Sequence, residues 1–379
     1  MPHRSDASMQ RQLIAFCLLL VHLLAGCGSS HQNPPPPTKK LVPKFVYVAN
    51  YGSASVSAFG VKASTGALSA LPGSPFVSGA GPFAVVLDSK SKFLYVADHV
   101  GFLSVYRINP DGGLSEIVGS PYAIGINANG MALHPSGNFL YVANTDGGVG
   151  NIWRYAVDPN TGAIQTASAT PFAAGTEPTW LAMDRSAHFV YASDIAANQL
   201  LGFSIDLATG ALTPVPGSPV PTGVFPNSVT VDPTGDFVYV PCQGDDAVFA
   251  YRVDPGTGAM TPVNGSPFPV GDVPLYAATD PSGKFLYVTN AFSSNLSAFT
   301  IDSSMGSLTS IAGSPFSAGG APIALAVDPS ANFLFVTKSD STISVYRVGR
   351  NGDLSAIAGS PFGPTGNEPR AMAIVAELE

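Results

Sequence analysis

A short apolar pattern led by phenylalanine recurs along the chain. It reads FVYVAN in the first copy and FLYVTN in the sixth, and the seven copies begin at Phe45, Phe93, Phe139, Phe189, Phe237, Phe285 and Phe333. The intervals are 48, 46, 50, 48, 48 and 48 residues, so the copies fill the chain to its end. Such regular spacing predicts an array of similar supersecondary units.

Each copy contains four strand patterns separated by turn patterns. In the copy that starts at Asn227, the predicted strands are NSVTV, FVYV, DDAVFAYRV and AMTPV, and the turns are DPTGD and DPGTG. The aspartate bonds its own backbone, proline presets φ, and glycine accepts the positive φ that closes the reversal. Short strands with this punctuation predict antiparallel meanders.

Seven four-stranded units with strands apolar on both faces predict an all-β, seven-bladed β-propeller. The final run, PRAMAIVAE, is an inner strand without a blade, whereas the first blade lacks an inner strand. We therefore expect the C-terminal strand to pair with the strand at Phe45, close the ring and cover edges that otherwise invite aggregation.

The predicted propeller has two faces. The top face carries the loop before each inner strand and the loop between the second and third strands, and the bottom face carries the DPTGD and DPGTG turns. The loops into the inner strands repeat a GSPF-like string rich in glycine. No helix follows to supply donors for a phosphate, so we expect their Pro and Phe to pin the outer strands.

The N-terminal residues predict export. Arg4 and Arg11 precede an apolar run that is too short to span a bilayer as a mature helix. The run ends in Leu24-Ala25-Gly26-Cys27, which resembles the cleavage box of bacterial lipoproteins and implies that Cys27 is lipidated. The alternative is an ordinary signal peptide with an accidental cysteine.

Three segments follow from this interpretation. Residues 1–26 are expected to be a lipoprotein signal peptide, 27–43 a lipidated cysteine with a proline-rich tether, and 44–379 the propeller. Acyl chains would hold the protein at the extracytoplasmic side of the bacterial envelope, in the periplasm or on the cell surface. We expect a monomer that meets the membrane through this anchor.

Composition supports the fold class and excludes some functions. Charged residues make up 11% of the chain, against roughly 25% in typical soluble proteins. Without residues 1–26, the chain keeps 15 basic and 24 acidic residues and a charge near −9. Nucleic-acid binding is excluded because it needs clustered Lys and Arg. Only Cys242 remains after the signal peptide and the lipidated cysteine, so no disulfide framework is possible, and we expect a small buried thiol.

The repeat is similar to that of the YVTN-repeat, lactonase-type propellers, which include bacterial 6-phosphogluconolactonases and carboxymuconate cyclases. The tetrapeptide stands at Tyr287-Val288-Thr289-Asn290, with YVAN at 47 and 141, and the similarity covers residues 45–379. The WD dipeptide and the kelch double glycine are missing. The resemblance implies a propeller fold and, less specifically, an activity on lactones.

Propeller ligands usually bind at the channel mouth, so the first residues of the inner strands are the informative ones. These positions combine aromatic, amide and charged side chains, and the expected ligand-binding residues are Phe83, Asn129, Trp180, Asn227, Tyr276 and Arg370. Such a ring suits a sugar-like or lactone ring, with the aromatic residues as stacking surfaces. The alternative is that the aromatic residues fill space between blades and the polar ones meet water.

The resemblance also implies catalytic residues, since the family's hydrolases carry an Arg-His pair after a proline and a Glu elsewhere. Here Pro369-Arg370 matches, but Ala371 occupies the histidine position. Candidate catalytic residues are therefore Arg370, Glu177, Glu368 and His99, the one histidine expected near the mouth. His134 and His188 fall in predicted bottom turns.

Charge narrows the ligand class. The predicted top loops hold Asp98, Asp146, Glu177, Asp194, Asp245, Asp246, Asp272, Asp340 and Glu368 against Lys338 and Arg370. This field disfavours a phosphorylated sugar but not a neutral lactone, a glycan or a protein. Calcium at Asp245-Asp246, or at Asp98 with Asp340, lacks a series of ligands at suitable spacing, so we expect no metal and no cofactor.

Two functions remain open. The favoured one is a lipid-anchored module that binds a ligand or partner without catalysis. The alternative is a lactone hydrolase or cycloisomerase in which Arg370 and Glu177 or Glu368 bind and polarise the ring.

Overall fold

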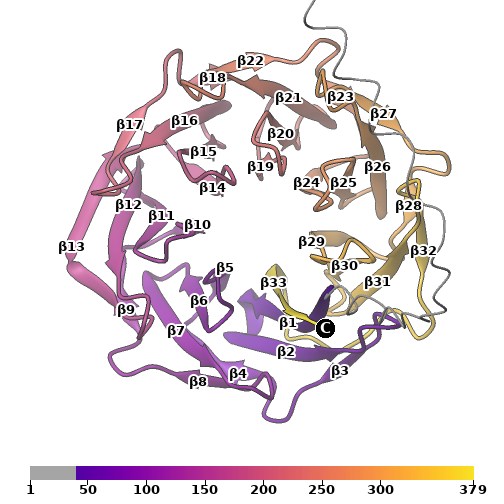
Figure 1. The fold of residues 1–379 in the computed structure, drawn as a ribbon, viewed down its shortest axis with the longest axis horizontal. Helices are drawn as coiled ribbons and strands as arrows, with labels where there is room; N and C mark the ends of the chain where they lie inside the picture. The colour runs from indigo at the N-terminus through magenta and orange to yellow at the C-terminus, as the bar shows by residue number, and fades with distance from the viewer. Residues whose placement is uncertain (1–39) are drawn as a thin grey trace, which may run out of the picture. The chain divides into compact units, whose positions relative to one another are not determined.

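The computed structural model describes residues 40–379, which form a ring of seven antiparallel sheets (Figure 1). Every described element is a strand except a 3-10 turn, η1 (Tyr51–Ser53). The predicted signal peptide and the lipidation of Cys27 lie outside these residues. Strand β1 begins at Leu41, so residues 41–43, which we expected in the tether, belong to the propeller. The described part contains no helix of the length and apolarity needed to cross a membrane.

The first four blades consist of the following strands. Blade 1 holds β1 (Leu41–Asn50), β2 (Ser55–Val61), β3 (Leu68–Ala70), β4 (Phe76–Val77) and β33 (Pro369–Leu378). Blade 2 holds β5 (Pro82–Leu87), β6 (Phe93–Asp98), β7 (Phe102–Ile108), β8 (Leu114–Glu116) and β9 (Tyr122–Ala123). Blade 3 holds β10 (Ala128–Leu133), β11 (Phe139–Asp146), β12 (Val149–Val157) and β13 (Ile164–Ala173). Blade 4 holds β14 (Pro178–Met183), β15 (Phe189–Asp194), β16 (Gln199–Ile205), β17 (Leu212–Pro214) and β18 (Val220–Pro221).

The last three blades follow the same order. Blade 5 holds β19 (Thr230–Val231), β20 (Phe237–Cys242), β21 (Ala247–Val253), β22 (Met260–Pro262) and β23 (Phe268–Pro269). Blade 6 holds β24 (Pro274–Thr279), β25 (Phe285–Asn290), β26 (Asn295–Ile301), β27 (Leu308–Ser310) and β28 (Phe316–Ser317). Blade 7 holds β29 (Pro322–Val327), β30 (Phe333–Lys338), β31 (Ile343–Val348) and β32 (Leu354–Ala356).

The C-terminal strand closes the ring as predicted. β33 pairs with β1 in antiparallel register, with Val46 opposite Ile374 (Figure 1). The backbones of Lys40 and Glu379 exchange hydrogen bonds of 2.8 and 2.9 Å. The Lys44 ammonium lies 2.6 Å from the Glu377 carboxylate across the same seam. The chain therefore enters and leaves the propeller at the same place on the bottom face.

The outer strand of most blades is split, which the sequence did not predict. Between its two pieces the serine of the GSP string accepts a hydrogen bond from the backbone N–H of the third strand. Six copies make this contact at 2.9–3.0 Å through Ser74, Ser120, Ser218, Ser266, Ser314 and Ser360. The repeated loop therefore has a structural role, as expected, although these hydrogen bonds come from its serine and not from the Pro and Phe.

One inner strand is shorter than predicted. NSVTV was expected to be a strand from Asn227, yet β19 contains only Thr230 and Val231. The neighbouring strand β20 carries Pro241, whose carbonyl accepts a hydrogen bond from the Asn227 N–H at 3.1 Å. Because proline has no N–H to return, the ladder cannot continue there.

A glycine in the turn between the third and fourth strands locks each blade to its predecessor. It has a positive φ and rests on the phenylalanine that leads the repeated apolar pattern in the preceding blade. The seven pairs are Phe45–Gly112, Phe93–Gly162, Phe139–Gly210, Phe189–Gly258, Phe237–Gly306, Phe285–Gly352 and Phe333–Gly66. A Cβ atom added to Gly66 would lie 2.6 Å from the Phe333 ring, so no larger residue fits without a shift.

A tyrosine two residues beyond the phenylalanine strengthens the lock. Its hydroxyl donates to the carbonyl of the same glycine at 2.8–3.2 Å in Tyr47–Gly112, Tyr141–Gly210, Tyr191–Gly258, Tyr239–Gly306 and Tyr287–Gly352. Between blades 7 and 1, Phe335 takes the place of this tyrosine. There the Arg347 guanidinium stacks on Phe333 at 4.8 Å and donates to the Ser64 carbonyl at 3.2 Å.

We predict that Gly306→Ala destabilises the fold more than Gly217→Ala. Both residues have a similar positive φ, 73° and 77°, which costs alanine about 1 kcal/mol. Only at Gly306 would the new methyl overlap the Phe237 ring, whereas nothing lies within 4 Å at Gly217. This overlap should lower the free energy of unfolding of Gly306→Ala by about 1–3 kcal/mol more than that of Gly217→Ala. Denaturant midpoints measure the difference. An equal decrease in midpoint for both variants would show that the contact between Gly306 and Phe237 does not limit the residue at position 306.

Candidate functional site

A cavity of about 410 Å³ opens at the channel mouth on the top face. Its wall comes from the entries of four inner strands and the neighbouring loops: Phe83, His99, Asn127, Asn129, Thr145, Glu177, Thr179, Trp180, Ile195 and Asn227. The volume is that of a small-molecule site. The structure therefore brings together six of the predicted residues: Phe83, His99, Asn129, Glu177, Trp180 and Asn227.

Bulges at the strand entries position these side chains. In blades 2, 3 and 4 the ladder between the inner and second strands skips one residue, which is Phe83, Asn129 and Thr179 respectively. In blade 1 the same skip leaves Arg370 without a partner opposite it. A bulge redirects the extra side chain, and in blades 1, 2 and 4 the skipped residue directly follows a proline.

Polar groups in the wall lack protein partners. Asn129 is only 6% exposed, yet its carboxamide makes no hydrogen bond within residues 40–379. The Glu177 carboxylate, the Asn227 carboxamide and the Trp180 indole N–H also make no hydrogen bond in the described chain, although these three side chains are only half-buried. In addition, His99 Nδ1 and Thr145 Oγ1 are buried without a partner. Buried polar atoms are normally satisfied, and His99 Nδ1 and Thr145 Oγ1 are not. The half-buried polar groups beside them are open to a ligand that forms hydrogen bonds.

Other polar groups of the wall hold the loops in place. The Asn127 amide donates to the Thr145 carbonyl at 2.9 Å. The Thr179 hydroxyl lies 3.0 Å from the Ser193 hydroxyl and donates to the Asn227 carbonyl at 3.2 Å. These contacts fix the backbone on both sides of the cavity, so the unpartnered groups project from an ordered frame.

Arg370, which we expected to bind the ligand, is not one of the residues that line the cavity, but it contacts one of them. Its guanidinium stacks on Tyr51 at 5.4 Å and on the cavity residue Phe83 at 5.8 Å. Its Nε is buried without a partner, and Nη2 lies 3.7 Å from the Glu368 carboxylate. Glu368, a predicted catalytic candidate, thus contacts Arg370 and does not line the cavity.

Sequence reasoning missed Tyr51. It follows the first YVAN and lies in η1, where its ring also packs edge-on to His99 at 6.1 Å between centroids. Phe83 lies beside the same imidazole at 6.1 Å. The signal available in the sequence was an aromatic residue directly after a second strand, at the predicted mouth.

Tyr276 does not line the cavity, contrary to our expectation. Its ring packs edge-on against Trp180, with centroids 4.9 Å apart and an interplanar angle of 90°. Burial raises the pKa of the Tyr276 hydroxyl, and the Arg370 charge partly offsets this rise. Tyr276 therefore supports Trp180 from behind, which is the space-filling role we considered as the alternative.

Two acidic residues of the top loops, Asp98 and Asp194, accept hydrogen bonds from the backbone of these loops. Asp98 is buried and accepts from the Phe102 N–H at 2.7 Å, and burial raises the pKa of its carboxyl. Asp194 is fully buried and accepts from the N–H groups of Thr176 and Glu177 at 2.8 and 2.9 Å. Asp194 therefore fixes the backbone that carries Glu177.

Lys338 is likewise unavailable to a ligand. Its side chain is buried, with Nζ 3.2 Å from the Asp340 carboxylate and 3.3 Å from the Gly319 carbonyl. Arg370 is then the one basic side chain that reaches the channel mouth in the described top loops.

The remaining chemical candidates lie elsewhere. His134 and His188 contact Ser136 and Ser186 at 2.7 Å in bottom turns, as predicted. Cys242 is fully buried, and burial raises its thiol pKa to about 11, so it is the inert thiol that we expected. Among residues 40–379, no three His, Cys, Asp or Glu side chains lie close enough to hold a metal ion.

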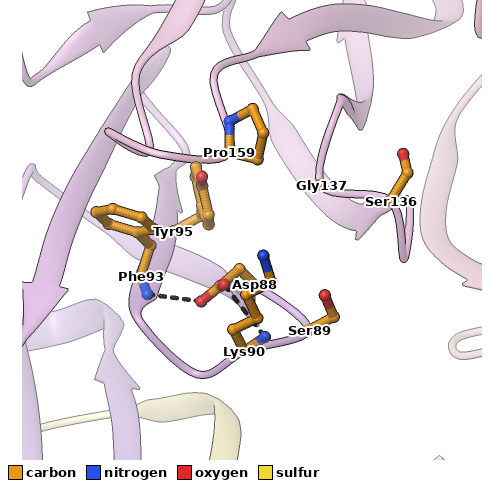
Figure 2. A pocket seen from close by; sticks show the side chains of 8 residues that line it. All are labelled: Asp88, Ser89, Lys90, Phe93, Tyr95, Ser136, Gly137 and Pro159. Atoms are coloured by element: carbon orange, nitrogen blue, oxygen red, sulfur yellow. Dashed lines mark hydrogen bonds between the residues drawn. The ribbon is translucent and has the colours of Figure 1, made fainter.

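A second hollow on the bottom face is too small to be a site. Figure 2 shows it between the Asp88 turn and the next blade, and its volume is about 20 Å³. The Asp88 carboxylate already accepts from the backbone N–H groups of Phe93 at 2.6 Å and Lys90 at 3.2 Å. The hollow holds roughly one water molecule.

Comparison with known proteins assigns the family. The family described as lactonase, 7-bladed beta-propeller, matches residues 64–183, 165–274 and 277–367, which is most of the chain. The chain belongs to this lactonase family. No curated protein matches it.

Solved structures share the fold of this lactonase-family chain. A putative 6-phosphogluconolactonase from Bacteroides uniformis is 18% identical, with a TM-score of 0.75 over 89% of this chain and 100% of that one. The periplasmic gluconolactonase PpgL of Pseudomonas aeruginosa is 17% identical, with a TM-score of 0.74 over 88% and 99%. A putative 6-phosphogluconolactonase from Bacteroides fragilis is 18% identical, with a TM-score of 0.75 over 88% and 98%.

The Arg-His pair that the family resemblance implies has no room for its histidine on the inner strand of blade 3. Gly130 occupies the histidine position of blade 3, and a Cβ added there would lie 2.8 Å from Trp180 Cα. In blade 1 the position is Ala371, which is buried in the core beside Tyr47 and Val375. Any acid-base chemistry in this site must therefore come from the loop residues that line the cavity.

We predict that Asp194→Asn lowers stability and that Asp146→Asn does not. Asp194 is buried and caps three backbone N–H groups, those of Thr176, Glu177 and Ala197, and an amide in its place would turn a donor toward at least one of them. The unpaired N–H groups should lower the free energy of unfolding by about 1–3 kcal/mol. Asp146 is exposed and caps nothing in the described loops. Denaturant midpoints measure both variants, and equal midpoints would contradict the capping role.

Proposed function

We propose that the protein binds a neutral sugar lactone, or a ring of similar polarity, at the channel mouth and hydrolyses its ring ester. One observation carries this proposal: the unpartnered carboxamides of Asn129 and Asn227 and the carboxylate of Glu177 line one cavity beside the Trp180 ring. Hydroxyl groups on a ring satisfy amide and carboxylate groups, and the apolar face of the ring packs on an aromatic surface. The lactonase-family assignment supports an ester as the reacting group.

The residues divide the chemistry as follows. Glu177 accepts a proton from the water that attacks the ester carbonyl carbon. Arg370, held by Tyr51 and Phe83, donates hydrogen bonds to the carbonyl oxygen as negative charge develops on it. The ring C–O bond then breaks, and its oxygen takes the proton back from Glu177, which yields an open-chain hydroxy acid.

Charge favours a neutral substrate. The top loops carry exposed carboxylates at Asp146, Asp245, Asp246 and Asp272, and Arg370 lies 3.7 Å from the Glu368 carboxylate. A doubly charged phosphate would be repelled by this field. We therefore place the 6-phosphorylated lactone outside the substrate range.

The second candidate is a ring-binding module without catalysis. The absence of a histidine at positions 130 and 371, where the resemblance implies one, favours it. Glycans are the natural ligands in that case. The same cavity and the same Trp180 would bind them.

We also propose an extracytoplasmic monomer anchored through Cys27. One structural neighbour is a periplasmic gluconolactonase, and the N-terminal sequence has the pattern of an exported lipoprotein. Lys40 enters the propeller on the bottom face beside Glu379, whereas the cavity opens on the top face. Such a tether would leave the mouth facing away from the point of attachment.

Hydrolysis of glucono-δ-lactone by the purified chain tests the proposal. We expect turnover above the buffer rate that falls about 100-fold or more in Glu177→Gln and in Arg370→Ala. Glu116→Gln, which changes an exposed carboxylate on an outer strand, should keep full activity. Turnover that survives Glu177→Gln would refute the assigned chemistry. No turnover, with glycan binding that is lost in Trp180→Ala, would establish the second candidate instead.

A further inference from the structure

Exposed apolar side chains gather on the top loops of blades 5 and 6. Phe292 is 79% exposed, Phe225 53% and Val224 40%. Single exposed apolar residues are common on protein surfaces, but these three belong to the first and the last of four loops that hydrogen bonds connect in series. We call the surface formed by loops 222–226, 243–246, 270–273 and 291–294 the blade 5–6 crown.

Hydrogen bonds join the four loops into one surface. Gly244 N–H donates to the Val224 carbonyl at 2.9 Å, and Val273 N–H donates to the Asp246 carboxylate at 2.9 Å. Phe292 N–H donates to the Asp272 carbonyl at 3.2 Å. The backbone beneath the exposed rings is therefore ordered, so a partner would lose little free energy in fixing it.

Phe225 is held in an uncommon conformation. Its φ is +54°, a region that bulky residues rarely adopt. Its N–H donates to the Asn198 side chain at 2.9 Å, and its carbonyl accepts from the Gln243 N–H at 3.1 Å. These bonds keep the ring at the surface.

The charge of the crown selects the partner. Asp245, Asp246 and Asp272 are exposed among the apolar residues, and the four loops contain no Lys, Arg or His. An anionic lipid surface would be repelled, and a second copy of this face would bring like charges together. Arginine and lysine both pair with carboxylates and stack on phenylalanine rings.

We propose that the blade 5–6 crown is a docking surface for a protein segment that presents arginine or lysine alternating with apolar residues. The apolar side chains pack against Phe225, Phe292 and Val224, and the cationic groups pair with the three aspartates. This surface is separate from the cavity, whose wall comes from blades 2 to 5 through other residues. The inference therefore does not depend on the proposed activity.

Binding of a labelled peptide that alternates Arg and Leu to the full chain tests this inference by fluorescence anisotropy. We expect saturable binding that weakens at high salt, and no binding of the matched Glu and Leu peptide. Phe225→Ser with Phe292→Ser should weaken the affinity about tenfold or more. Asp272→Asn, whose side chain makes no hydrogen bond in the described chain, should weaken it by about two- to threefold and reduce its salt dependence.

The matched control is Leu207→Ser with Met305→Ser, which removes two exposed apolar residues, 51% and 54% exposed, from bottom turns. This variant should bind the peptide like the parent chain. The inference is overturned if the Arg and Leu peptide does not bind, if the control variant loses as much affinity as the crown variant, or if vesicles of anionic lipid bind instead.

Discussion

The contact between a phenylalanine of one blade and a turn glycine of the next is the constraint on which the structure depends. Neighbouring blades are joined covalently only where the chain passes from one to the next. Their packed faces are therefore held in place by side-chain and backbone contacts. The glycine lets the turn settle onto the ring, and the tyrosine hydroxyl bonds the carbonyl that this approach exposes. Seven such contacts between phenylalanine and glycine, including Phe333–Gly66 between blades 7 and 1, set the relation of each blade to the next.

This lock sits at the bottom face and leaves the top face free for function. At the strand entries the pairing between the inner and second strands skips one residue, so Phe83, Asn129 and Arg370 have no partner in the ladder. The turns at the bottom satisfy their aspartates internally, as Asp88 does (Figure 2). The mouth instead collects polar groups without partners. The difference between the two faces locates the ligand site more firmly than any single residue does.

Much of the fold followed from the sequence because its periodicity is strong. The copies led by Phe45 and Phe333 fixed the number of blades, and the unpaired run at residues 369–378 predicted how the ring closes. The short length of β19 was missed because its cause lies in another strand. Pro241 belongs to β20, and its missing N–H ends the pairing of β19 with β20. The split outer strands were missed because a serine that caps another strand looks like any loop serine.

The site was only partly predictable for a related reason. Alignment of the repeats identified the entry positions, and six of the expected residues meet in the cavity. Alignment alone could not separate Glu177 from Glu368, since both precede a proline, and only three-dimensional packing shows that Glu368 pairs with Arg370. Tyr51 was missed and Tyr276 was wrongly placed for the same reason, because their positions depend on contacts with side chains of other blades, Phe83 for Tyr51 and Trp180 for Tyr276.

The central claim is that the unpartnered groups around Trp180 form a ligand site, and tryptophan fluorescence tests it most directly. The chain has two tryptophans, and Trp153 packs among the blade 2 and 3 core residues. In Trp153→Phe, titration with glucono-δ-lactone or its hydroxy acid should produce a saturable change in the Trp180 signal. In Trp180→Phe, which keeps Trp153, the signal should not change. No saturable response in Trp153→Phe, or the same response in both variants, would contradict the account.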